Sequence, residues 1–199
     1  MSPRTSQQLD DIREQSKTKI IEAATSLFAL QGYHSTSIQQ IAKEAGVAKG
    51  LIYNYFESKE DLMNAIFMVN MAEGEAIIAR LEACTTAADK LRFLIDISFE
   101  YVLNRPLHTK LMIGLALQMD HFPKLKALVI GKYTGLMPMM AHLLGEMGVA
   151  HPLEEARLLA TAMDGFSLQY IVLGDTARIH EMQQYLYLKY GLNNGSAQT

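Results

Sequence analysis

Residues 35–61 restrict the fold of this 199-residue chain more strongly than any other stretch. They read STSIQQIAKEAGVAKGLIYNYFESKED, and the first apolar residues recur at the spacing of one buried helix face: Ile38, Ile41, Ala42 and Ala45. Gly46 follows, where a helix end favours a residue that tolerates positive φ. A second short helix is then expected from Ala48 or Lys49 to Phe56. A helix, a glycine turn and a short helix at this spacing predict a helix-turn-helix, whose second helix reads DNA.

Capping residues set the predicted boundaries of these helices. Thr36 and Ser37 each precede a glutamine by three residues, so either could begin a capping box. Ser58 is expected to cap a third helix, with Asp61 at the third position of that helix. The caps therefore bracket the short DNA-reading helix on both sides.

The run IAKEAGVAKGLIYNYFESKEDL closely resembles the DNA-binding signature of the tetracycline-repressor (TetR) family of bacterial regulators. The resemblance rests on the turn glycine, the Tyr-x-Tyr-Phe block and the following Ser-Lys-Glu-Asp, which stand in the family's order. It extends from Lys17 to about Phe67, whereas the rest of the chain shares only the family's general helical character. A member of this family would bind double-stranded DNA as a homodimer and regulate transcription.

Side chains around the second short helix are predicted to hold the DNA backbone. The resemblance implies that Tyr53 and Lys59 contact phosphates, as the tyrosine hydroxyl and the lysine ammonium are suited to do. It also implies that Thr36 or Ser37 contacts the backbone through its hydroxyl and the helix N-terminus. This end of the chain should therefore touch phosphates on both sides of the turn.

Other residues of the same helix are candidates for closer contact with DNA. Gly50 lets the backbone approach a base edge or phosphate, while Lys49 and Asn54 could contact bases or nearby phosphates. Tyr55 could either contact DNA or pack inside the domain. The complete predicted set is Thr36, Ser37, Lys49, Gly50, Tyr53, Asn54, Tyr55 and Lys59.

The remaining chain reads as helices throughout, with no strand pattern. Residues 1–15 are expected to be a mobile arm, and the first firm helix should run from about Ser16 to Leu30. Further helices are expected at 58–83, 90–104, 108–119, 125–147 with a kink at Pro138, 152–173 and 178–190. The predicted fold is therefore all-α, with an N-terminal three-helix domain that contains the helix-turn-helix. Its parts are the arm and DNA-binding domain at 1–57, an effector-binding and dimerisation domain at 58–190 that starts with a connecting helix at 58–83, and a disordered tail at 191–199.

The helix over residues 153–173 is apolar on more than one face and must be buried. Its resemblance, with the following helix, to the last two long helices of the TetR family implies a four-helix bundle between two copies. The alternative, that this helix lies at the centre of its own domain, stays open. The predicted dimer interface contains Ala156, Leu159, Ala160, Met163, Tyr185 and Leu186.

Aromatic and methionine side chains of the second domain could line a pocket for a small molecule, because such linings are common in ligand sites. The chain has 12 methionines, which suit adaptable pockets and ordinary cores alike. The plain alternative is a filled core, and Asp164 or His142 could supply a polar anchor. The predicted pocket residues are Phe99, Leu111, Met112, Leu115, Met119, Tyr133, Met137, Phe166 and Tyr170.

Catalytic, metal and cofactor motifs are missing from the sequence. None of the six histidines stands in an HExxH or Glu-x-x-His pattern, and no GxGxxG, P-loop or GxSxG motif occurs. A single Cys84 fits a reducing cytoplasm, and we expect neither a signal peptide nor a run of about 18 apolar residues that would span a membrane. We therefore predict a cytoplasmic protein that is not an enzyme and needs no cofactor or metal.

Two functions remain after these exclusions. The first is a homodimeric regulator, a repressor that a small, largely apolar effector releases from a palindromic operator. The second is an all-α ligand-binding or enzymatic bundle in which the N-terminal motif is only structural. The basic and aromatic residues of the second short helix favour the regulator, although a net charge of −3 requires that any DNA-binding field be local.

Overall fold

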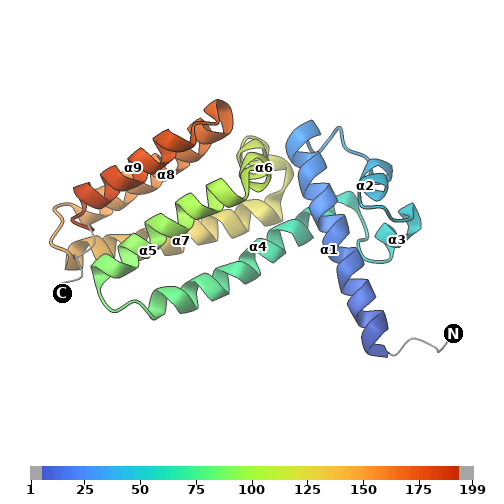
Figure 1. Ribbon diagram of the computed structural model, residues 1–199, viewed down its shortest axis with the longest axis horizontal. Helices are drawn as coiled ribbons and strands as arrows, with labels where there is room; N and C mark the ends of the chain where they lie inside the picture. The colour runs from blue at the N-terminus through green and yellow to red at the C-terminus, as the bar shows by residue number, and fades with distance from the viewer. Residues whose placement is uncertain (1–5, 193–199) are drawn as a thin grey trace. The chain divides into compact units, whose positions relative to one another are not determined.

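The computed structural model describes residues 6–192, which form helices and connecting turns and contain no strand (Figure 1). The α-helices are α1 (Ser6–Gln31), α2 (Ile38–Glu44), α3 (Lys49–Tyr53), α4 (Lys59–Glu82), α5 (Ala87–Asn104), α6 (Pro106–Ala116), α7 (Pro123–Glu146), α8 (Pro152–Leu173) and α9 (Thr176–Lys189). One short 3-10 helix, η1 (Met119–His121), precedes α7. The prediction of an all-α fold is confirmed.

Contacts divide the chain into two compact units, Met1–Glu73 and Gly74–Thr199. The division falls inside α4, so the first half of this helix belongs with α1, α2 and α3. The sequence placed its boundary at Glu57, before that helix begins. The difference arises because the start of α4 contributes buried Leu62, Met63 and Ile66 to the described core of the first unit.

The first unit packs short helices on a long one. α1 contributes an apolar face that includes Ile20, Ala24 and Phe28, and all three side chains are buried. Ile41 of α2 and Ile52 of α3 are fully buried as well. Helices of seven and five residues are too short to be stable alone, so this burial holds them in place.

α1 begins at Ser6 rather than near Ser16, so the expectation that residues 6–15 form a mobile arm is wrong. Glutamine, glutamate, arginine and leucine are good helix formers, and they dominate this stretch. The hydroxyls of Ser16 and Thr18 also donate to carbonyls one turn back, at 2.8 and 3.0 Å. The part of the predicted arm at residues 1–5 lies outside the described residues, as does most of the predicted tail, at 193–199.

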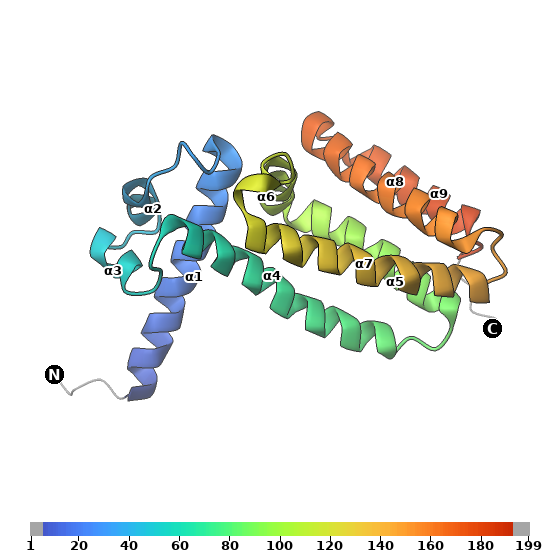
Figure 2. The ribbon, with the colours of Figure 1, turned by 180° about the vertical axis from the view of Figure 1, so that it is seen from behind.

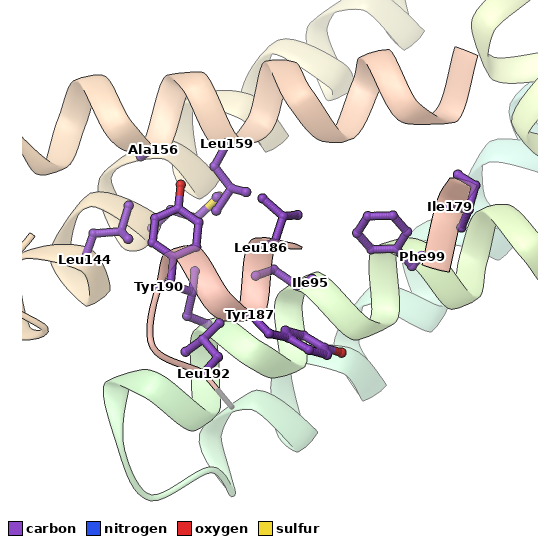
Figure 3. Close-up of a cluster of buried hydrophobic side chains, with 12 residues drawn as sticks. Ile95, Phe99, Leu144, Ala156, Leu159, Ile179, Leu186, Tyr187, Tyr190 and Leu192 are labelled. Atoms are coloured by element: carbon purple, nitrogen blue, oxygen red, sulfur yellow. The ribbon is translucent and has the colours of Figure 1, made fainter. Parts of the chain in front are cut away.

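The second unit places α8 and α9 side by side and packs them against α5 and α7 (Figures 1 and 2). Its core joins buried side chains from all four helices, and Figure 3 shows many of them. The core comprises Leu91, Ile95, Phe99, Met140, Leu144, Ala156, Leu159, Ile179, Leu186, Tyr187, Tyr190 and Leu192.

Most predicted helices of this unit exist, with shifted ends. α8 spans Pro152–Leu173 as expected. α5 begins at Ala87, three residues before the expected start at residue 90, because Thr86 is its N-cap. Asp89 completes a capping box as the third residue of α5. α9 begins at Thr176 because the side chain of Asp175 accepts a hydrogen bond from the backbone N–H of Arg178, at 3.1 Å.

α7 is 24 residues long and, by length and composition alone, apolar enough to cross a membrane. The expectation concerned an unbroken run of about 18 apolar residues, and α7 contains no such run, because Lys126 and Lys132 interrupt it. Met140, Leu143 and Leu144 of α7 are buried within the second unit, and α7 continues through Pro138. A single helix of this kind is weak evidence for a membrane span, because the core helices of water-soluble bundles meet the same criterion.

Candidate functional site

α3 has one buried anchor and an exposed opposite side. Ile52 is fully buried, whereas Lys49, Gly50 and Asn54 are exposed and Tyr53 keeps 51% of its surface accessible. The turn before α3 is made by Gly46 at φ +67°, where a side chain would be strained. The helix-turn-helix therefore presents a cation, an amide and a phenol on one short exposed helix.

Ser37 and Thr36, the two candidate caps, have different roles. Ser37 is the N-cap of α2, and its hydroxyl accepts from the backbone N–H of Gln40 at 3.2 Å. Thr36 is 1% exposed, and its hydroxyl donates to the carbonyls of Gly32 at 2.9 Å and Leu27 at 3.3 Å. The predicted DNA contact through the Thr36 hydroxyl is therefore wrong, because that group is used to close the end of α1.

Lys59, the first residue of α4, points its ammonium at the turn between α1 and α2. The ammonium donates to the carbonyl oxygens of Tyr33 at 2.8 Å, Thr36 at 2.9 Å and His34 at 3.4 Å. It also lies 4.4 Å from the centre of the Tyr33 ring. Burial lowers the pKa of Lys59, because part of its water shell has been replaced by protein.

Tyr55, two residues after the end of α3, is half-buried. Its ring lies 6.3 Å from the ring of Phe56, and the guanidinium of Arg13 lies 5.8 Å from its centre. The sequence left contact and packing open for Tyr55, and this surrounding favours packing. Arg13 was missed as a neighbour because residues 6–15 were not expected to be helical.

Two hollows open between helices of the second unit. The first lies between α8 and α9 and is lined by Phe166, Gln169, Tyr170, Leu173, Asp175, Arg178, Ile179 and Met182. The second lies among α5, α8 and α9 and is lined by Ser98, Phe99, Val102, Met163, Phe166, Ser167 and Ile179. Both are small and partly open to solvent, so only a rearranged unit would hold a large ligand.

Three of the predicted pocket residues, Phe99, Phe166 and Tyr170, line these hollows, and the rings of Phe99 and Phe166 stack at 6.1 Å. The other six do not line them: Leu111, Met112, Leu115, Met119, Tyr133 and Met137. Leu111 and Leu115 are buried as core residues. Sequence periodicity cannot separate a residue that lines a hollow from one that fills the core beside it.

The two candidate polar anchors already have partners. The hydroxyl of Tyr133 donates to Asp164 at 2.9 Å, and partial burial together with this carboxylate raises the pKa of Tyr133 to about 12. His142 lies 3.6 Å from Glu146 on the exposed side of α7. Neither Asp164 nor His142 lines one of the two hollows.

The predicted dimer residues are largely in the core of one chain. Ala156, Leu159 and Leu186 are at most 4% exposed, so their assignment to an intermolecular surface is wrong. Ala160 and Met163 are partly buried, and Tyr185 is 56% exposed. The opposite faces of α8 and α9 carry exposed apolar side chains that the sequence analysis did not select: Leu158, Leu168, Val172 and Leu188.

No group of three metal-binding side chains occurs in the part of the chain that the structure describes. Cys84 is partly exposed, and its Sγ lies 3.5 Å from the carbonyl of Arg80. The fold and the site together define a class of protein. The first unit contains a helix-turn-helix, and the second unit is a bundle of helices.

Comparison with known proteins agrees with this class. Residues 20–66 match the family described as bacterial regulatory proteins, tetR family. The fatty acid metabolism regulator protein of Bacillus subtilis is 39% identical over 82 residues, which cover 41% of this chain and 42% of that protein. Residues 20–66 therefore belong to the tetR family of bacterial regulatory proteins, and the Bacillus subtilis protein that they resemble is a regulator.

The solved structures extend the likeness in fold to nearly the whole chain. The regulator FadR from Bacillus subtilis, solved with stearoyl-CoA, has a TM-score of 0.72 at 21% identity, covering 87% of this chain and 96% of that one. A protein from Saccharomonospora viridis, solved with choline, has a TM-score of 0.75 at 22% identity, with coverages of 88% and 96%. By contrast, the sequence matches to the first curated relatives span only 22% to 47% of their lengths.

Proposed function

We propose that the protein is a homodimeric transcriptional repressor that a small, largely apolar effector releases from a near-palindromic operator. The observation that carries this proposal is the exposed side of α3, where Lys49, Tyr53 and Asn54 project from a helix that Ile52 anchors. A reader helix needs this combination, because its contacts must be free while its backbone is fixed. A regulator of this kind acts on chromosomal DNA and therefore in the cytoplasm.

The exposed faces of α8 and α9 support assembly into a dimer. Leu158, Leu168 and Val172 recur along α8, and Tyr185 and Leu188 lie on α9 with more than half of each surface exposed. Water-exposed apolar side chains gathered on two neighbouring helices are the usual sign of a protein interface. A two-fold dimer carries two readers, so each operator should contain two half-sites that mirror each other.

An apolar effector is supported by the lining of the two hollows. Their aromatic and aliphatic side chains come from α5, α8 and α9, and few charged groups reach them. FadR from Bacillus subtilis was solved with stearoyl-CoA, and the protein from Saccharomonospora viridis with choline. From these two structures we take only that proteins of this fold hold small molecules.

Selection of binding sequences from random DNA duplexes tests the proposal directly. We expect one enriched motif with two mirrored half-sites about one helical turn, ~34 Å, apart or somewhat more. Lys49→Gln should then weaken binding to the selected operator about tenfold, because it removes a cation from the reader. Lys124→Gln, which neutralises an exposed lysine of the second unit, should leave operator binding unchanged. Enrichment of no motif would overturn the proposed function.

A further inference from the structure

The exposed side of α3 has an order that follows from helix geometry. An α-helix turns by about 100° per residue, so the buried Ile52 fixes which residues point away from the protein. Gly50 and Asn54 are both exposed and four residues apart, so they lie one above the other on the side opposite Ile52. Leu51 and Tyr53 lie on the two flanks. Gly50 and Asn54 are therefore the middle of the surface that α3 offers to DNA.

Within the described residues, nothing requires glycine at position 50. Its backbone is ordinary helix, and a Cβ built there would meet no described atom within 4 Å. Alanine favours a helix more than glycine does, so this glycine weakens a helix that is only five residues long. The missing side chain instead leaves the middle of the surface flat. A flat middle lets the backbone of α3 come close to the base edges in the major groove.

Asn54, the C-cap of α3, presents its amide beside this flat position. Its backbone N–H donates to the carbonyl of Leu51 at 3.2 Å, and its φ of −75° is one that any residue adopts, so the cap does not need asparagine. No group among residues 6–192 bonds the side-chain amide, whose N–H and C=O are both available. In the major groove, adenine alone offers an acceptor and a donor side by side, N7 and N6, which an asparagine amide matches with two hydrogen bonds.

Leu51 provides an apolar side chain next to Asn54. The two residues are three apart, which makes their side chains neighbours on one edge of the helix. Leu51 is only partly buried, and its side chain has no polar atom for a base edge or a phosphate. The thymine methyl is the one apolar group that base pairs present in the major groove. Three helical residues rise by about 4.5 Å, close to the ~3.4 Å between stacked base pairs, so Leu51 and Asn54 suit adjacent pairs.

We propose that each operator half-site contains two adjacent A·T pairs, in which Asn54 binds the adenine of one pair and Leu51 contacts the thymine methyl of the other. Gly50 allows the close approach that both contacts need. The proposal rests on the proposed function and adds to it the bases that α3 selects. Lys49 does not contribute to this assignment, because its ammonium suits a guanine and a phosphate alike.

Chemically altered operators test each contact without altering the protein. The wild type first selects its operator from random duplexes. In one half-site, each thymine is then replaced by uracil, which lacks only the methyl, and each adenine by 7-deazaadenine, which lacks the N7 acceptor. The same replacements outside the half-sites are the controls. Affinity is measured for the wild type, Asn54→Ala, Leu51→Ala and Gly50→Ala, together with the Tm of each free protein.

We expect one adenine at which 7-deazaadenine lowers wild-type affinity about tenfold, and an adjacent pair at which uracil lowers it about fourfold. The first loss should be absent in Asn54→Ala and the second in Leu51→Ala, because each variant already lacks the group that makes the contact.

Gly50→Ala should have a Tm equal to or above that of the wild type, since alanine is the better helix former. It should nevertheless bind the operator about tenfold more weakly, because the added methyl separates α3 from the bases. Its affinity for DNA of unrelated sequence should stay the same, since that binding depends on phosphate contacts.

Four other results would contradict the proposal. They are a selected half-site without adjacent A·T pairs, losses at the altered bases that persist in full in Asn54→Ala and Leu51→Ala, a wild type that is insensitive to both altered bases, and a Gly50→Ala variant that binds operator like the wild type. If a variant does not fold, the response of the wild type to uracil and 7-deazaadenine decides, because it needs no substitution. If the wild type selects no motif at all, the proposed function itself has failed, before any base is assigned.

Discussion

Glu155, in the first turn of α8, accepts hydrogen bonds from two side chains at the end of α9. Lys189 forms a short ion pair with its carboxylate, and the hydroxyl of Tyr190 donates to the same oxygen at 2.8 Å. The hydrogen bond from Lys189 and then that from Tyr190 lower the pKa of Glu155 below its usual 4.5. The charged carboxylate therefore links the start of α8 to the end of α9.

Glu155→Gln should lower the free energy of unfolding by about 1 kcal/mol at pH 7, because the amide accepts more weakly than the carboxylate. A lowered folded-state pKa means that the stabilisation is complete above the unfolded value near 4.5 and disappears as the pH falls through the folded value. The difference between wild type and variant should therefore be present at pH 7 and become smaller as the pH falls below 4.5. Urea unfolding at pH 7 and at pH 3 measures it.

Glu154→Gln, at the exposed neighbouring position, is the matched control and should change stability by less than Glu155→Gln does at pH 7. A Glu155→Gln variant whose deficit persists unchanged at pH 3 would contradict the assigned role of the carboxylate.

At the scale of residues, the sequence identified which side chains of the helix-turn-helix are exposed, but it did not identify their hydrogen-bond partners. Lys49, Tyr53 and Asn54 were expected to be available to DNA, and they are exposed. Thr36 and Lys59 were expected to face DNA as well, yet their polar atoms bind backbone carbonyls. Backbone carbonyls are the same in every residue, so a side chain's preference for them leaves no signal in the sequence.

At the scale of elements, local capping chemistry decides where helices begin. Thr86 and Asp89 form a reciprocal box at the start of α5: each side chain accepts from the other's backbone N–H, at 3.1 and 3.2 Å. Thr86→Ala should destabilise the protein by about 1 kcal/mol, since it leaves an N–H group of the first turn without its acceptor. Thr86→Ser should recover most of this loss, because it keeps the hydroxyl.

Chemical denaturation of the three proteins measures this effect. Equal stability of Thr86→Ala and Thr86→Ser would show that the hydroxyl does not contribute to the stability of the protein. The slope of the transition should stay the same in all three, because the surface exposed on unfolding does not change.

The helices that were predicted most accurately are those whose ends are marked by proline or glycine. α8 lies between Pro152, which suits a first turn, and Gly174, which adopts φ +66°, so both of its ends could be read from the sequence. The start of α1 could not, because an exposed polar helix has the same composition as a mobile arm. The sequence also did not show which faces of α8 and α9 stay exposed. Both helices are apolar on more than one side, and the packing of neighbouring helices determines which side is buried.

At the scale of the whole molecule, the exposed face of α8 predicts the oligomeric state. Val172→Arg places a charge at a position that is 70% exposed in one chain, so the fold of that chain should be unaffected. In a dimer joined through α8 and α9 the same charge would be buried without a partner, which is costly. Light scattering at micromolar concentration should therefore show a dimer for the wild type and a monomer for Val172→Arg.

Leu117→Arg is the matched control, because Leu117 is an exposed apolar residue that lies outside α8 and α9. This variant should keep the mass of the wild type. A monomeric wild type, or a Val172→Arg variant that remains dimeric, would show that these helices do not form the interface.

The proposed release of operator by an effector is the prediction at the largest scale. α4 spans Lys59–Glu82, so residues of this one helix belong to both units. A ligand can shift DNA binding only by its preference for the form that does not bind DNA, and a hundredfold release needs about 2.7 kcal/mol of coupling. The coupling is reciprocal, so saturating operator should weaken ligand binding by the same factor.

A thermal-shift screen of apolar and amphipathic small molecules, followed by titration of each hit against the operator complex, measures both directions of this coupling. We expect at least one hit whose affinity falls when operator is present and which lowers operator affinity by an equal factor. Phe166→Ala should weaken that hit, because Phe166 lines both hollows, while operator affinity without ligand should stay near the wild-type value. Hits that bind tightly and leave operator affinity unchanged would show that the second unit does not control the reader, and that the protein's own concentration sets repression.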